Sequence, residues 1–100
     1  MATLHVHLQE GFAGEHVTVT VDGRPAIDKS QVTTRPQLGL ADMVELDVPA
    51  GKVTIDVALE ERGETHSLTI DAAETPFLGL SIAPDGSLAS KLSSTTFGYV

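Results

Sequence analysis

The stretch Met43-Val-Glu-Leu-Asp-Val-Pro-Ala-Gly-Lys-Val-Thr-Ile-Asp-Val-Ala-Leu-Glu60 decides the fold class. Apolar and polar residues alternate along 43–48 and again along 52–60, so each run has one apolar and one polar face. A period of two is typical of a half-buried β-strand, whereas the apolar residues of an amphipathic helix recur every three or four positions. Pro49, Ala50 and Gly51 separate the runs and fit a tight turn. The stretch therefore predicts two amphipathic strands joined by a turn.

The same alternation recurs along the rest of the chain. Asp22-Gly23 and Asp85-Gly86 supply turn residues that tolerate a positive φ, and 61–64 fits a hairpin loop. The segment 28–42 shows no period, and we expect it to be an irregular crossover between two sheets. The predicted strands are 3–9, 16–22, 43–48, 52–60, 65–71, 77–82 and 87–92. They predict an all-β fold, a single antiparallel β-sandwich domain of about seven strands that spans residues 1–100.

Composition narrows the class of function. The chain has 100 residues, of which 41% are apolar, and its 14 acidic residues against 6 Lys plus Arg give a formal net charge of −8. Length and apolar content predict one folded domain. The acidic balance argues against nucleic acid and anionic membranes as partners, because proteins bind both through Lys and Arg. The absence of cysteine excludes disulfides, thiol catalysis and thiolate metal sites.

The N-terminal sequence gives an expectation about location. Residues 1–6 lack the basic start and the apolar run of a signal peptide, and no apolar stretch of the sequence is long enough to span a membrane. We therefore expect a cytoplasmic protein, with a module cut from a longer secreted chain as the alternative.

Two turn-and-strand patterns carry a family resemblance. Residues 17–26 contain a strand that ends in Gly23-Arg-Pro25, and residues 39–57 contain a strand, the turn Pro49-Ala-Gly51 and a second alternating strand. This part of the chain, within 17–60, resembles the prealbumin-like, carboxypeptidase-regulatory-like β-sandwich family. The resemblance implies a sandwich of prealbumin-like or Ig-like type. The hydrolase branch of prealbumin-like proteins ends in a Tyr-Arg-Gly-Ser-type motif, whereas this chain ends Phe97-Gly-Tyr-Val100, so hydrolase activity is not expected.

Histidines are the first candidates for metal ligands. His5 and His7 lie two residues apart on a predicted strand, so both project from one face and can approach one divalent ion. If 3–9 and 16–22 form a hairpin, His16 joins them as a diagonal neighbour on that face. The three residues would then form a site for zinc, nickel or copper. The alternative is that they are solvent-facing strand residues without a ligand, and His66 is expected to be a half-buried structural residue near a strand end.

Aromatic residues are the candidates for protein contacts. Phe12 lies at the tip of the predicted hairpin, and Phe97 and Tyr99 alternate just before Val100. Exposed aromatic side chains are enriched at protein interfaces, so Phe12, Phe97, Tyr99 and Val100 form the candidate protein-binding set. The alternative is that Phe12 folds back to close one end of the sandwich, and that Phe97 and Tyr99 complete the last core strand.

Two hypotheses about function follow. No residues form a convergent catalytic set or a binding motif for an organic cofactor, which favours a non-catalytic protein-binding or assembly module, an accessory subunit that binds a protein partner or a second copy of itself. The alternative is a divalent-metal-binding protein, or a metal-assisted enzyme, that uses the His5-x-His7 pair.

Overall fold

The computed structural model describes residues 2–97 and consists of strands and connecting turns, with no helix in that range. Each predicted alternating run forms a strand, because most of its apolar residues can be buried on one side. No helix within residues 2–97 is long and apolar enough to cross a membrane. The strands are β1 (Ala2–Leu8), β2 (Ala13–Val21), β3 (Arg24–Thr33), β4 (Asp42–Val48), β5 (Lys52–Leu59), β6 (Glu64–Asp71), β7 (Phe77–Ile82) and β8 (Leu88–Ser93).

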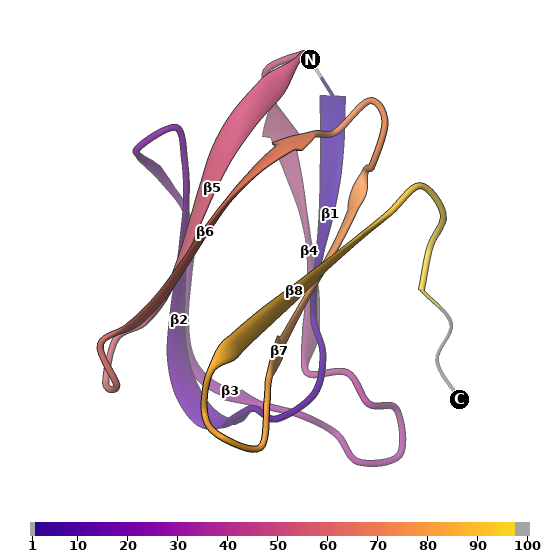
Figure 1. Ribbon diagram of the computed structural model, residues 1–100. Coiled ribbons are helices and arrows are strands. Elements are labelled where there is room, and N and C mark those ends of the chain that lie inside the picture. The colour runs from indigo at the N-terminus through magenta and orange to yellow at the C-terminus, as the bar shows by residue number, and fades with distance from the viewer. Residues whose placement is uncertain (1, 98–100) are drawn as a thin grey trace.

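The strands form two sheets of four, with the orders β4-β1-β7-β8 and β3-β2-β5-β6 (Figure 1). The two sheets share a core between them, which confirms the all-β prediction and its sandwich-like layering. The expected antiparallel pairing has one exception, because β1 and β7 are parallel neighbours. The other strand pairs are antiparallel.

The core lies between the sheets and is built from the inward-facing apolar residues of the strands. Its central members have less than 2% of their surface exposed, and burial of this kind is the main stabilising contribution to a domain of this size. The largest of these side chains are Leu4, Leu8, Ile55, Leu59, Leu78 and Leu80.

Strand β3 was not expected, since 28–42 was predicted to be an irregular crossover. Only Ile27 and Val32 of this edge strand are buried, and their odd spacing hides any period of two. The pairing with β2 contains register shifts, and Gln31 has a φ of 56°. A bulged edge strand of this kind has no alternating pattern to detect, so residues 2–97 form eight strands where about seven were expected.

The predicted hairpin between 3–9 and 16–22 is also wrong. Strand β1 pairs with β4 and β7, while β2 pairs with β3 and β5 in the other sheet. After β1, the carbonyl of Glu10 still accepts a hydrogen bond from the Ile82 amide (2.8 Å), and the chain turns at Gly11 with a φ of 88°. A Cβ at Gly11 would lie 2.1 Å from the carbonyl oxygen of Ile82. The connection therefore passes tightly from one sheet to the other instead of folding back within one sheet.

Candidate functional site

Rings gather on the side of the β4-β1-β7-β8 sheet that faces away from the core, here called the outer face. Two rows of residues that are paired across all four strands, here called registers, define it. In the first, Met43, His7, Gly79 and Lys91 lie side by side, and in the second, Glu45, His5, Phe77 and Ser93 do so. The outer face is the place where this chain departs most from the expected alternation of an apolar interior and a polar exterior.

Four rings of the outer face form one contact group, here called the aromatic cluster: His5, His7, Phe77 and Phe97. The His5 and Phe77 rings are stacked, with centroids 4.7 Å apart and an interplanar angle of 19°. His7 meets Phe77 edge-on at 6.1 Å and Phe97 edge-on at 5.2 Å. The two phenylalanine rings are 6.5 Å apart, so the cluster is continuous and has the offset and edge-to-face geometries that aromatic rings prefer.

Phe97 belongs to the segment that follows β8, and this segment folds back along the side of the sheet away from β2 and β5 (Figure 1). The Lys91 Nζ lies 5.3 Å from the centroid of the Phe97 ring, in the range of a cation–π contact. The alternative that Phe97 completes a core strand is therefore wrong for this residue, because Phe97 follows the last residue of β8 and packs on the outer face. Tyr99 and Val100, the other C-terminal candidates, lie outside the described residues.

His7 is the most buried ring of the outer face, with 4% of its surface exposed. It projects away from the core, as the alternation predicts, but Phe77 and Phe97 pack against it. Burial, and to a smaller extent the neighbouring His5, lowers the pKa of His7 below its ordinary value. His7 is therefore a neutral imidazole at neutral pH.

A glycine in β7 makes room for a polar side chain beside the cluster. A Cβ at Gly79 would lie 2.6 Å from Oε1 of Gln9, so the Gln9 side chain lies directly over the β7 backbone. Gln9 is 8% exposed although it follows the outward parity of His5 and His7. A glycine within a strand is the sequence signal for such a close approach.

The outer face carries rings on its central strands, and its two edge strands carry Met43 and the charged side chains. Met43 is 58% exposed beside the cluster. Glu45 and Asp47 are exposed on the β4 edge, and Lys91 is exposed on the β8 edge. His5 Nδ1 lies 3.5 Å from the Glu45 carboxylate, which links the cluster to the acidic edge.

The outward-facing side of the second sheet has a different composition. Its side chains are almost all hydroxyl-bearing or charged, as expected for a sheet face that remains in water. On β2, β5 and β6 they are His16, Thr18 and Thr20 of β2, Lys52, Thr54, Asp56 and Ala58 of β5, and Thr65, Ser67, Thr69 and Asp71 of β6. The outward side of the second sheet is therefore chemically unlike the outer face.

The structure does not bring the three predicted metal ligands together. His5 and His7 share the outer face of β1, whereas His16 lies on β2 in the other sheet because the predicted hairpin does not form. There the Nε2 of His16 is hydrogen-bonded to the Asp28 carboxylate, and this contact raises the pKa of His16. Within residues 2–97, no group of three or more His, Asp or Glu side chains is arranged to hold a metal ion.

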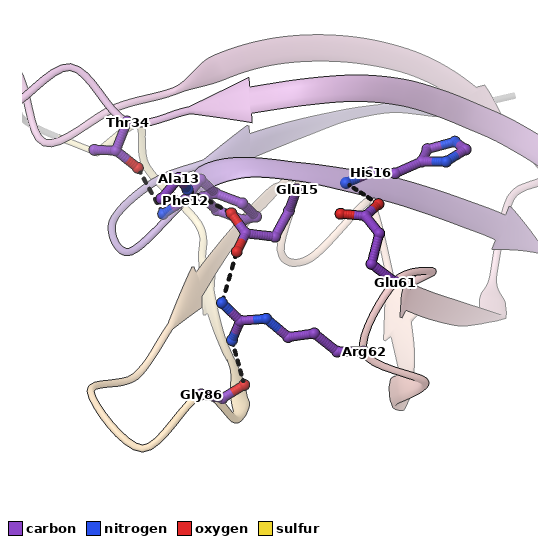
Figure 2. Close-up of polar contacts among 8 residues, drawn as sticks. All are labelled: Phe12, Ala13, Glu15, His16, Thr34, Glu61, Arg62 and Gly86. Carbon is purple, nitrogen blue, oxygen red and sulfur yellow. Dashed lines mark hydrogen bonds and ion pairs between the residues drawn. The ribbon is translucent and has the colours of Figure 1, made fainter.

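Phe12 is not an exposed contact residue. Only 3% of its surface is exposed, and it belongs to the core, so the alternative that it closes one end of the sandwich is confirmed. Its amide donates a hydrogen bond to Oγ1 of Thr34 (3.0 Å) (Figure 2). Thr34 donates in turn to the carbonyl of Gln9 (2.6 Å). Thr34 thus fixes the turn that carries Phe12 into the core.

A buried carboxylate near Phe12 was missed in the sequence. Glu15 accepts hydrogen bonds from the Ala13 amide and from Nη2 of Arg62 (2.7 Å), while Nη1 of Arg62 donates to the Gly86 carbonyl (3.4 Å) (Figure 2). The contact ties together three connections at one end of the sandwich. Its signal was present, because Glu15 shares the inward parity of Val17 and Val19. A charged residue at an inward position predicts a buried ion pair.

His66 conforms to its prediction. It is half-buried on the inward side of β6, and its Nε2 is 2.9 Å from Oγ of Ser90 on β8. This contact joins the edges of the two sheets and explains the residue without a ligand.

A groove of about 570 Å³ lies between the β3 and β4 ends of the sheets. Val21, Pro25 and Leu46 line it together with the charged Arg24 and Asp47. The groove holds no histidine and contains none of the predicted site residues.

Comparison with known proteins gives no relative: no family model, no curated protein and no solved structure matches this chain.

Proposed function

We propose that this protein is a non-catalytic protein-binding or assembly module, and that it binds its partner through the outer face. The observation that carries the proposal is the apolar surface of that face, where the aromatic cluster lies over the central strands and Met43, 58% exposed, lies beside it on the β4 edge strand. The opposite sheet presents hydroxyl and charged groups to solvent at the corresponding positions.

The composition of the outer face is that of an interface. Aromatic side chains and methionine are enriched where proteins meet, and charged side chains are typical of the rim. Here the rings of His5, His7 and Phe77 lie on the central strands β1 and β7, Met43 lies beside them on the β4 edge strand together with Glu45, and Lys91 lies on the opposite edge strand β8. The rings are held by mutual packing before any partner arrives, so little side-chain entropy would be lost on binding.

We also propose that the two-sheet fold is of the prealbumin-like or Ig-like type. The turn Gly23-Arg-Pro25 leads from β2 into β3, and Pro49-Ala-Gly51 leads from β4 in one sheet to β5 in the other. These are the two turns on which the resemblance to carboxypeptidase-regulatory-like domains rests. A solved experimental structure with the same strand order in a protein of that family would support the assignment.

Site-specific photocrosslinking tests the binding proposal. A photoreactive phenylalanine analogue replaces Met43 on the outer face or, as the matched control, Thr54 on the outward side of β5. Both residues are exposed and belong to strands. We expect irradiation in the cells that naturally make the protein to give one discrete adduct from position 43, which excess unlabelled protein suppresses, and none from position 54. No adduct from position 43, or the same adducts from both positions, would overturn the proposal.

A further inference from the structure

We infer that the partner of the outer face is a second copy of this chain, related by a two-fold axis that runs parallel to the strands. The inference rests on the proposed function and adds the identity of the partner. In this arrangement the β8 edge of one copy lies over the β4 edge of the other, and the same contacts occur twice, as in any isologous dimer.

The distribution of charge on the outer face favours this arrangement. In β1, β4, β7 and β8 the outward charged residues are Glu45 and Asp47 on β4 and Lys91 on β8, so the acids and the cation lie at opposite edges of one sheet. A two-fold axis along the strands exchanges these edges. The positive edge of each copy then meets the negative edge of the other, which is the complementarity that sets orientation and excludes wrong partners.

The registers bring the charges within reach. Lys91 and Met43 belong to the same register across the sheet, and Glu45 belongs to the next one. An axis through the centre of the sheet therefore places Lys91 of one copy over Met43 of the other. Glu45 lies two residues along β4, about 7 Å away, a distance that a lysine side chain spans.

The apolar centre of the face coincides with the axis. The axis passes between β1 and β7, the two central strands of the sheet, and these strands carry His5 and Phe77. The stacked pair of one copy then lies against that of the other, with Phe97 beside it. Ring-to-ring contact at the centre and ion pairs at the rim match the usual anatomy of a protein interface.

The size of the face predicts a weak dimer. Four strands of about seven residues cover a plane of about 19 by 23 Å, or about 440 Å² per copy. Stable interfaces bury about 800 Å² per partner, so the contact belongs to the small, transient class. The net charge of −8 on each copy also opposes association at low salt. We therefore expect a dimer that forms at high micromolar concentration and at physiological ionic strength.

Sedimentation equilibrium of charge-swap variants tests the inference. We expect Lys91→Glu and Glu45→Lys each to weaken dimerisation about tenfold, because each replaces two attractive contacts with repulsive ones. The double variant with both substitutions should recover most of the affinity, since the pair is restored with its signs reversed. Lys52→Glu makes the same charge change on an exposed residue of the opposite sheet and should leave the dimer unaffected.

Several results would overturn the inference. They are a chain that stays monomeric at about 1 mM, a Lys52→Glu variant that loses as much affinity as Lys91→Glu, and a double variant that fails to recover. The crosslinking experiment separates this failure from that of the proposed function. An adduct from position 43 with the mass of two copies supports both, whereas an adduct with a different protein supports the proposed function and rejects the second copy as partner.

Discussion

Replacing His7 with alanine should destabilise the protein by about 2–3 kcal/mol, although His7 lies on a strand face that points away from the core. His7 is only 4% exposed and makes edge-on contacts with Phe77 and Phe97. Each such ring pair contributes about 0.5–1.5 kcal/mol beyond the burial of its area, so the two pairs give about 1–3 kcal/mol, to which the vacated space adds. For a domain of this length the loss corresponds to a fall in Tm of about 10–20 °C.

Chemical and thermal unfolding, followed by circular dichroism, measure the effect. His16→Ala is the matched control, because His16 projects from the outward side of the opposite sheet and makes its side-chain contact with the exposed Asp28. The control should change the free energy of unfolding by no more than about 0.5 kcal/mol. A double-mutant cycle with Phe97→Ala should give a coupling energy of about 1 kcal/mol. A His7→Ala variant as stable as the control, or a coupling energy near zero, would refute the packing of the C-terminal segment on the outer face.

Three further predictions follow from the outer face. Because the pKa of folded His7 lies below that of an unfolded histidine, the unfolded state binds more protons between the two values. The free energy of unfolding should therefore fall as the pH drops below about 6.5, by at most about 1.4 kcal/mol per pH unit. His7→Phe should remove this contribution to the slope in urea titrations across pH 4–7. Gly79→Ala should cost about 1–3 kcal/mol by overpacking against Gln9, and Gln9→Ala in the same chain should recover part of the loss in thermal unfolding, whereas an unaffected Gly79→Ala would contradict the close approach. Zinc, nickel or copper should leave Tm unchanged. The metal-binding alternative would instead be favoured if metal raised the Tm of the parent by several degrees but did not raise the Tm of the His5→Ala, His7→Ala double variant.

The alternation of residues predicted which face of most strands is buried, but it could not predict which strands pair. Parity assigned Leu4, Val6 and Leu8 of β1 to the core, and all three are buried. Pairing partners depend on long-range contacts, and an alternating strand fits any neighbour that has the same pattern. The hairpin between 3–9 and 16–22 was therefore a plausible but wrong choice, and the metal cluster that depended on it was lost with it.

The candidate site was predicted in part. The sequence placed His5 and His7 on one outward face and singled out Phe97, yet it gave no reason to bring Phe97 onto His7, because that contact joins the two ends of the chain. The signals that were overlooked are local: the glycine within β7 at Gly79, and Glu15 at an inward position. Each marks a place where the alternating pattern is broken for a packing reason.

The most direct test of the central claim, that the outer face binds a second copy of this chain, is a concentration series of amide and methyl NMR spectra on the isotope-labelled protein. The account predicts that shifts from about 20 µM to about 1 mM are confined to the outer face, and are largest for the Met43 methyl group and for the amides around His5, Phe77 and Lys91. Thr18, Thr54 and Thr69 on the opposite sheet should not move. Spectra that do not change with concentration, or shifts centred on the threonine-bearing face, would contradict the account.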